Sequence, residues 1–115
     1  MKFREGKIDS FALVEVIGRV DSENSETLKD FLLELGKRER QVLIDCSALE
    51  YISSTGLGAL LMLLKLMQKK GGTLRLFGLS PRIAEVFEIS GFNKLFSIFP
   101  SLDTARRSDT QGDGH

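Results

Sequence analysis

The sequence holds one cysteine, one histidine and no tryptophan among its 115 residues. The single cysteine, Cys46, excludes a disulfide within the chain, and its place beside an apolar strand pattern favours a packing role over a nucleophilic one. The histidine is the last residue, which excludes internal histidine-based catalytic triads and metal sites. We therefore expect no catalytic residue, no metal and no cofactor.

Long apolar runs and clustered charge of one sign are also missing. The longest apolar run, residues 59–64, is far shorter than the ~20 residues that span a bilayer. The first residues lack the apolar core of a signal peptide. Sixteen basic and sixteen acidic residues balance, without the basic stripe that binds nucleic acid. We expect a soluble cytoplasmic protein that neither inserts into a membrane nor binds nucleic acid.

The glycine-rich loops of nucleotide-binding enzymes are absent as well. Neither Gly-x-x-x-x-Gly-Lys-[Ser/Thr] nor Gly-x-Gly-x-x-Gly occurs, and Gly56-Leu57-Gly58 is too short for either. Asp45 follows a predicted strand, as in receiver domains, but the early acids are not adjacent and provide no acidic pair for magnesium. We expect Asp45 to accept hydrogen bonds from the next loop. These absences argue against an enzyme.

What the sequence does contain is an alternation of strand and helix patterns. Two segments, residues 3–8 and 11–20, predict an antiparallel hairpin, the second being rich in β-branched residues. Caps and apolar periodicity of period 3.6 predict the helices. In order, the remaining predicted elements are helix 25–37, strand 41–45, a helix from 54 or 55 to 70, strand 73–77, helix 81–89, strand 95–99 and helical turns at 102–106.

This order of elements predicts the fold class. An opening hairpin followed by strand–helix alternation gives a mixed sheet whose later strands run parallel. We predict a single α/β domain over residues 1–107, with a mixed four- to five-stranded sheet, an N-terminal antiparallel hairpin and covering helices. Residues 108–115 are polar and glycine-rich, which predicts a disordered tail.

Three consecutive hydroxyl residues, Ser53, Ser54 and Thr55, precede the most apolar predicted helix. One of them can cap the helix by accepting a hydrogen bond from a backbone N–H group. Three are more than one cap requires. A helix N-terminus also carries partial positive charge and free N–H donors, so it accommodates phosphate. Capping and phosphorylation of a serine are compatible interpretations.

The run from Asp45 to Gly58, DCSALEYISSTGLG, resembles the signature of STAS domains, the anti-sigma-factor antagonists. In that family a strand ends in Asp, and a hydrophobic pair precedes Asp-Ser-Ser/Thr-Gly-Leu. The resemblance covers about residues 3–105, with weaker matches at 18–24, 79–81 and 90–92. It puts the phosphorylated serine on Ser54, with Ser53 and Thr55 as second choices. Ser53 stands where the family often has Asp.

The resemblance implies the same fold and a function in partner switching. The unphosphorylated form would bind an anti-sigma-factor serine/threonine kinase and free a sigma factor. The kinase would then phosphorylate Ser54, and a phosphatase would reverse it. The alternative is a STAS-type structural or regulatory subunit of a transporter or signalling scaffold, without phosphorylation. The implied partner-binding residues are Asp21, Asn24, Ser53, Ser54, Thr55, Gly56 and Leu57.

Two of these residues also have structural explanations. Asp21 lies in a polar loop, where a loop or capping role is as readily expected as a partner contact. Gly56 is either small so that a partner or a neighbouring loop can approach the backbone, or holds a positive φ angle. From the first alternative we expect Gly56→Ala to keep stability and weaken the complex. We expect Asp21→Ala to lose more partner affinity than stability.

Overall fold

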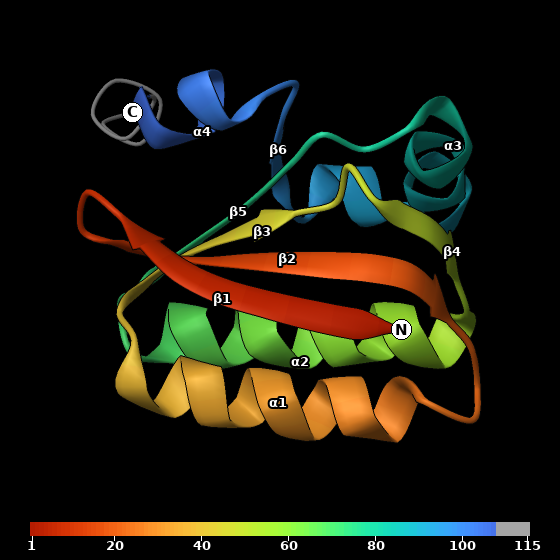
Figure 1. Cartoon of the computed structure of the whole chain (residues 1–115), viewed down its shortest axis with the longest axis horizontal. Helices are drawn as coiled ribbons and strands as arrows, with labels where there is room; N and C mark the ends of the chain where they lie inside the picture. The colour runs from red at the N-terminus through yellow and green to blue at the C-terminus, as the bar shows by residue number, and fades with distance from the viewer. Residues whose placement is uncertain (108–115) are drawn as a thin grey trace.

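Helices α1 and α2 cover one face of a mixed β-sheet, and α4 lies on the other face (Figure 1). The computed structural model describes residues 1–107, so the predicted disorder of residues 108–115 lies outside the described residues. The elements are β1 (Lys2–Ile8), β2 (Phe11–Val20), α1 (Ser25–Arg38), β3 (Gln41–Asp45), β4 (Leu49–Ile52), α2 (Ser54–Lys69), β5 (Thr73–Phe77), α3 (Pro81–Ser90), the 3-10 turn η1 (Phe92–Lys94), β6 (Ser97–Phe99) and α4 (Leu102–Arg107).

The sheet confirms the predicted fold class. Its strand order is β1-β2-β3-β5-β6, with β4 pairing β2 off this path. β1 and β2 form the predicted antiparallel hairpin, and the other pairs are parallel. Residues 1–107 contain six strands, more than the four or five predicted, because the sequence pattern predicts no strand where β4 lies.

The two halves of strand β2 pair with two different strands. Residues 12–15 pair with β3, and residues 18–20 pair with β4. The register shifts between Gly18 and Arg19, where Gly18 adopts a φ of 94° that only glycine takes readily. The Gly18 N–H group donates to the Ala48 carbonyl at 2.9 Å. The chain therefore leaves β3 at Asp45 and returns to β2 a few residues later.

The main core lies between the sheet and helices α1 and α2. The predicted apolar face of α1 is confirmed: Leu28, Leu32 and Leu35 are buried, and Phe31 stacks on Phe3 of β1 with ring centroids 4.4 Å apart. Helix α2 is apolar on two sides because it packs against both the sheet and α1. This packing fixes the start of α2 beside the end of β2.

The opposite face carries a smaller core under α4. Phe11, Leu43, Phe77 and Ala105 form it. Arg75 is only 2% exposed, and its Nη1 donates to the Ala105 carbonyl at 2.8 Å. A charged group so buried is stable only when it is hydrogen-bonded, so this contact fastens α4 to the sheet.

Helix α3 is capped as predicted, and its far end differs from the prediction. Ser80 Oγ accepts a hydrogen bond from the Ile83 N–H group at 3.3 Å, with Pro81 at the first helical position. The predicted strand 95–99 is shorter, because the N–H groups of Leu95 and Phe96 donate to the Phe92 carbonyl of the turn η1, and β6 begins only at Ser97. Phe96 is instead buried edge-on against Phe87, at 5.8 Å between ring centroids.

Candidate functional site

Ser53 is the residue that caps α2. Its backbone is extended (φ −81°, ψ 171°), and its Oγ accepts a hydrogen bond from the Gly56 N–H group at 3.1 Å. A second hydrogen bond joins Ser53 Oγ and Thr55 Oγ1 at 2.9 Å. Two of the three consecutive hydroxyls are therefore engaged with each other.

Ser54 is the first residue of α2, and its side chain is exposed. Within residues 1–107 its hydroxyl makes no hydrogen bond, in contrast to those of Ser53 and Thr55. The positive end of the α2 dipole and the unpaired N–H groups of the first turn lie beside it. Of the three hydroxyls, Ser54 is therefore the one that is both exposed and without a hydrogen bond within residues 1–107.

The loop between β2 and α1 is held by a reciprocal pair of side chains. Asp21 Oδ1 accepts hydrogen bonds from the N–H groups of Glu23 and Asn24, both at 3.0 Å. Asn24 Oδ1 accepts from the Asp21 N–H group at 2.9 Å, and Asn24 Nδ2 donates to the Arg19 carbonyl at 3.0 Å. Both residues thus shape the loop, and both remain partly exposed.

The structure joins this loop to the start of α2. The Ser53 N–H group donates to the Val20 carbonyl at 2.8 Å, one residue before Asp21. Five of the seven residues implied for partner binding therefore surround one exposed area, which we call the helix-start surface. It consists of Asp21, Asn24, Ser53, Ser54 and Thr55.

Gly56 and Leu57 do not belong to that surface. Leu57 is 6% exposed and packs in the core. A Cβ atom on Gly56 would lie 2.7 Å from Val20 Cγ1 and 2.8 Å from Ile52 Cγ1. Its φ is not positive, so the expectation of a left-handed backbone is wrong, and it is neighbouring segments of the chain itself that approach the Gly56 backbone. Gly56 is small because the neighbouring strands β2 and β4 pack against it.

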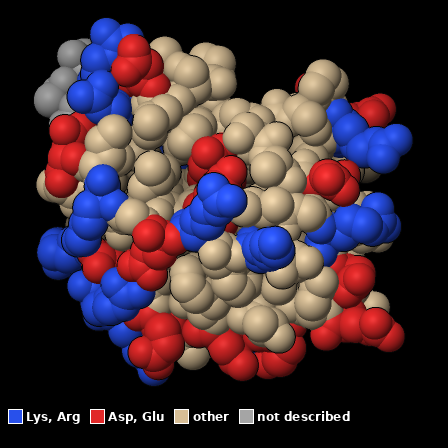
Figure 2. Space-filling model, in the orientation of Figure 1, with Lys and Arg blue, Asp and Glu red and all other residues tan. Residues whose placement is uncertain are grey.

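A groove between α1 and α2 continues from the helix-start surface. Its lining includes Ser22 and Glu26 on one side and Thr55, Gly58 and Met62 on the other. The sequence reasoning missed this groove, although the exposed Gly58 marked a point where α2 carries no side-chain bulk. In Figure 2 acidic and basic side chains are mixed on the left of the viewed face, and acidic side chains follow one another along its lower edge.

Asp45 and Cys46 behave as their residue types predicted. Asp45 Oδ1 accepts hydrogen bonds from the N–H and hydroxyl groups of Ser47, at 2.9 and 2.7 Å. Cys46 is buried in the core. Burial, together with the nearby charge of Asp45, raises the pKa of the Cys46 thiol to about 12. Within residues 1–107 no group of three His, Cys, Asp or Glu side chains could hold a metal ion.

The Cys46 thiol is expected to resist thiol reagents while the protein is folded. With its pKa raised to about 12, almost no thiolate exists at neutral pH, and the thiolate is the reactive form. Native protein mixed with a disulfide reagent under mildly alkaline conditions should react only as fast as it opens, whereas the denatured chain should react within the mixing time. Rapid stoichiometric labelling of the native protein would contradict this burial.

Replacing Asp21 is expected to weaken the fold as well as any complex. Asp21→Ala removes an acceptor from two backbone N–H groups, a loss of about 1–2 kcal/mol in the free energy of unfolding. Asp21→Asn keeps an acceptor oxygen and should lose less. Urea unfolding of the three proteins measures this difference. Equal midpoints for wild type and Asp21→Ala would rule out the loop role.

Within the part of the chain that the structure describes, no helix is both long and apolar enough to cross a membrane. Helix α2, the most apolar of them, is 16 residues long and packs within the main core.

The chain is similar in sequence to two bacterial proteins that are named as anti-sigma factor antagonists. The chain is 39% identical over 106 residues to the protein BtrV of Bordetella bronchiseptica, assigned as an anti-sigma factor antagonist, covering 91% of each chain. It is 31% identical over 85 residues to the anti-sigma-B factor antagonist of Bacillus subtilis, covering 74% of this chain and 78% of that one.

Two solved structures of one protein and a family model also match this chain. The Bacillus anti-sigma factor antagonist SpoIIAA, at 16% identity, superposes with a TM-score of 0.76 in its unphosphorylated form and 0.71 in its phosphorylated form. These pairs cover 93% of this chain and 96% and 99% of the SpoIIAA chains. The model of the STAS domain matches residues 5–105. The chain therefore belongs to the STAS-domain family.

Proposed function

We propose that this protein is an anti-sigma-factor antagonist that is switched by phosphorylation of Ser54. In its unphosphorylated form it binds an anti-sigma-factor serine/threonine kinase in the cytoplasm, and a sigma factor is released. The observation that carries the proposal is the exposed, unbonded hydroxyl of Ser54 between two hydroxyls that bond each other. The names of the relatives support the same role.

A phosphate on Ser54 is compatible with the fold. It adds about −1.5 to −2 charges at neutral pH, and the N-terminus of α2 stabilises negative charge. The side chain is exposed, so the phosphate displaces no packed residue. The superposition of phosphorylated SpoIIAA on this chain supports the idea that the fold tolerates phosphate.

The kinase, in this proposal, contacts the helix-start surface and the groove between α1 and α2. Ser54 directly precedes Thr55, which lines the groove, and directly follows Ser53, whose N–H group binds the end of β2. A new charge at that point lies inside the contact area, where an unmatched charge opposes binding strongly. A phosphatase restores the uncharged surface. Leu57 contributes only by packing the start of α2.

The experiment that tests this proposal is incubation with the cognate kinase and ATP, followed by intact-mass measurement and peptide mapping. Wild type and the control Ser10→Ala, which removes an exposed hydroxyl in the turn between β1 and β2, should each gain one phosphate on Ser54, and Ser54→Ala should gain none. A phosphate on Ser53 or Thr55 with Ser54 bare would contradict the site. Binding without any phosphorylation would favour the structural-subunit alternative.

A further inference from the structure

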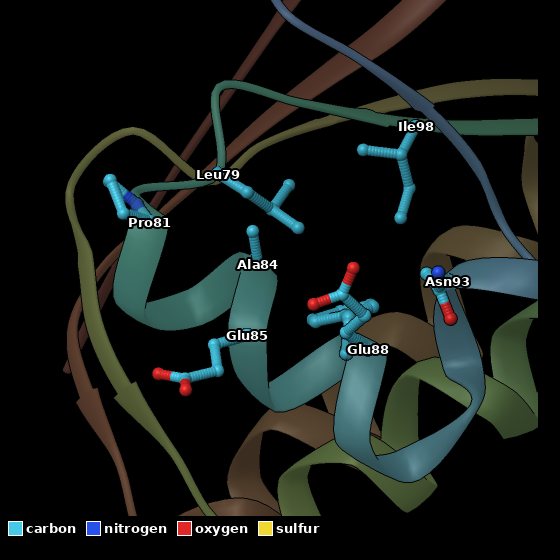
Figure 3. Close-up of a pocket in the computed structure, with 8 residues that line it drawn as sticks. Leu79, Pro81, Ala84, Glu85, Glu88, Asn93 and Ile98 are labelled. Atoms are coloured by element: carbon cyan, nitrogen blue, oxygen red, sulfur yellow. The ribbon is translucent and has the colours of Figure 1, made fainter.

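A pocket beside α3 lies apart from the surfaces described so far. It is formed by α3, the loop before it, η1 and β6, and it holds about 480 Å³ (Figure 3). Leu79, Phe87 and Ile98 contribute apolar lining, and Ala84 adds little bulk on the helix side. None of the lining residues belongs to α1, α2 or the β2–α1 loop. We call this the α3 pocket.

The charged residues that line the α3 pocket are both acidic. Glu85 and Glu88 line it from α3 and are exposed. In Figure 3 the carboxylate of Glu88 points across the opening toward Ile98, whereas that of Glu85 turns to the outer side of α3. Among the described residues neither glutamate forms an ion pair, and the nearby cations Arg82 and Lys94 do not line the pocket.

An exposed apolar side chain lies next to Glu85 and Glu88, which together we call the acidic rim of the pocket. Ile89 is 81% exposed, the largest exposed fraction among the large hydrophobic residues that the structure describes. It follows Glu88 directly and lies one helical turn beyond Glu85, so it flanks the rim on the outer side of α3. A single exposed isoleucine carries no meaning by itself. Beside an apolar pocket and two unpaired carboxylates, it completes a surface of alternating apolar and acidic character.

We propose that the α3 pocket docks another protein through an amphipathic segment that places a lysine or arginine beside an aliphatic side chain. The aliphatic side chain enters between Leu79 and Ile98, and the cation meets Glu88 at the opening. The negative charge of Glu85 and Glu88 favours a cationic protein segment, because it repels nucleic acid and anionic lipid. Since the pocket shares no residue with the helix-start surface, docking there does not depend on Ser54.

The proposal is tested with a synthetic helical peptide of leucine and lysine, titrated into the full chain and followed by fluorescence anisotropy. Two matched peptides replace every lysine by glutamate or every leucine by serine. The double variant Glu85→Lys/Glu88→Lys is compared with Glu34→Lys, which reverses an exposed charge on α1. Backbone amide shifts in NMR spectra locate the peptide, and circular dichroism confirms that each variant is folded.

The expected result is binding of the leucine–lysine peptide alone, with amide shifts centred on Ala84, Asn93 and Ile98. The double variant should raise Kd about tenfold or more, and Glu34→Lys and Ser54→Asp should leave it unchanged. Equal binding of the acidic peptide, shifts elsewhere, or an unaffected double variant would overturn the proposal. A dimer that sedimentation detects and the double variant abolishes would overturn it in favour of a second copy.

Discussion

Replacing Ser54 by aspartate is expected to leave the fold intact and to weaken the complex with the cognate kinase at least tenfold. The aspartate puts a fixed charge on the exposed first residue of α2, inside the proposed contact area. An unmatched charge in an interface costs several kcal/mol, and each ~1.4 kcal/mol is a factor of ten in Kd. Ser54→Ala should bind as tightly as the unphosphorylated wild type.

Titration calorimetry with purified kinase measures these affinities, and thermal unfolding checks the fold. Aspartate suits a helix N-terminus, so the melting temperature of Ser54→Asp should equal or slightly exceed that of the wild type. Gln68→Glu adds a charge to an exposed position near the other end of α2 and should leave the affinity unchanged. If Ser54→Asp bound the kinase as tightly as the wild type, negative charge at this position would not control binding. This conclusion would hold whether or not the kinase phosphorylates Ser54.

Gly56→Ala and Gly58→Ala are expected to change stability in opposite directions. The Cβ atom that Gly56→Ala adds would collide with branched side chains close to their backbones, Val20 Cγ1 at 2.7 Å and Ile52 Cγ1 at 2.8 Å. Such overpacking costs about 1–3 kcal/mol, against at most ~1 kcal/mol gained in helix propensity. At Gly58 no atom lies within 4 Å of the new Cβ, so only the gain of about 0.5–1 kcal/mol remains.

The two glycines serve as each other's control, because both lie in the first two turns of α2 and gain the same propensity. Calorimetric melting should show Gly56→Ala below the wild type by several degrees and Gly58→Ala at or above it. If Gly56→Ala melted as high as Gly58→Ala, Val20 and Ile52 would be able to move away from the added Cβ atom at no measurable cost in stability. The lowered stability of Gly56→Ala would also make any loss of kinase affinity in that variant indirect.

Local patterns in the sequence predicted most elements and missed β4. Its four residues, Leu49 to Ile52, are buried only at the two ends, and Glu50 and Tyr51 face outward. This arrangement produces neither the alternation of a half-buried strand nor the continuous apolar run of a buried one. Pairing of β4 with the second half of β2 depends on the register shift at Gly18, which no local pattern encodes.

At the candidate site, the sequence predicted the residue types and left their directions open. Ser53 and Ser54 are equivalent as residue types, and only the geometry of the helix start makes one the cap and the other exposed. The burial of Gly56 could have been predicted from the sequence. Gly56 precedes Leu60, Leu63 and Met67 by four, seven and eleven residues, so helical periodicity puts it on the buried face with them.

The hydrogen bond from the Ser53 N–H group to the Val20 carbonyl has a consequence for how fast the site can move. This amide joins the start of α2 to the end of β2, next to the buried side chains of Val20 and Ile52. It can exchange its proton with solvent only when the two elements separate, so it should exchange on the timescale of global unfolding. The candidate phosphorylation site then stands on a framework that stays closed for as long as the protein is folded, and a kinase must fit its surface as it is.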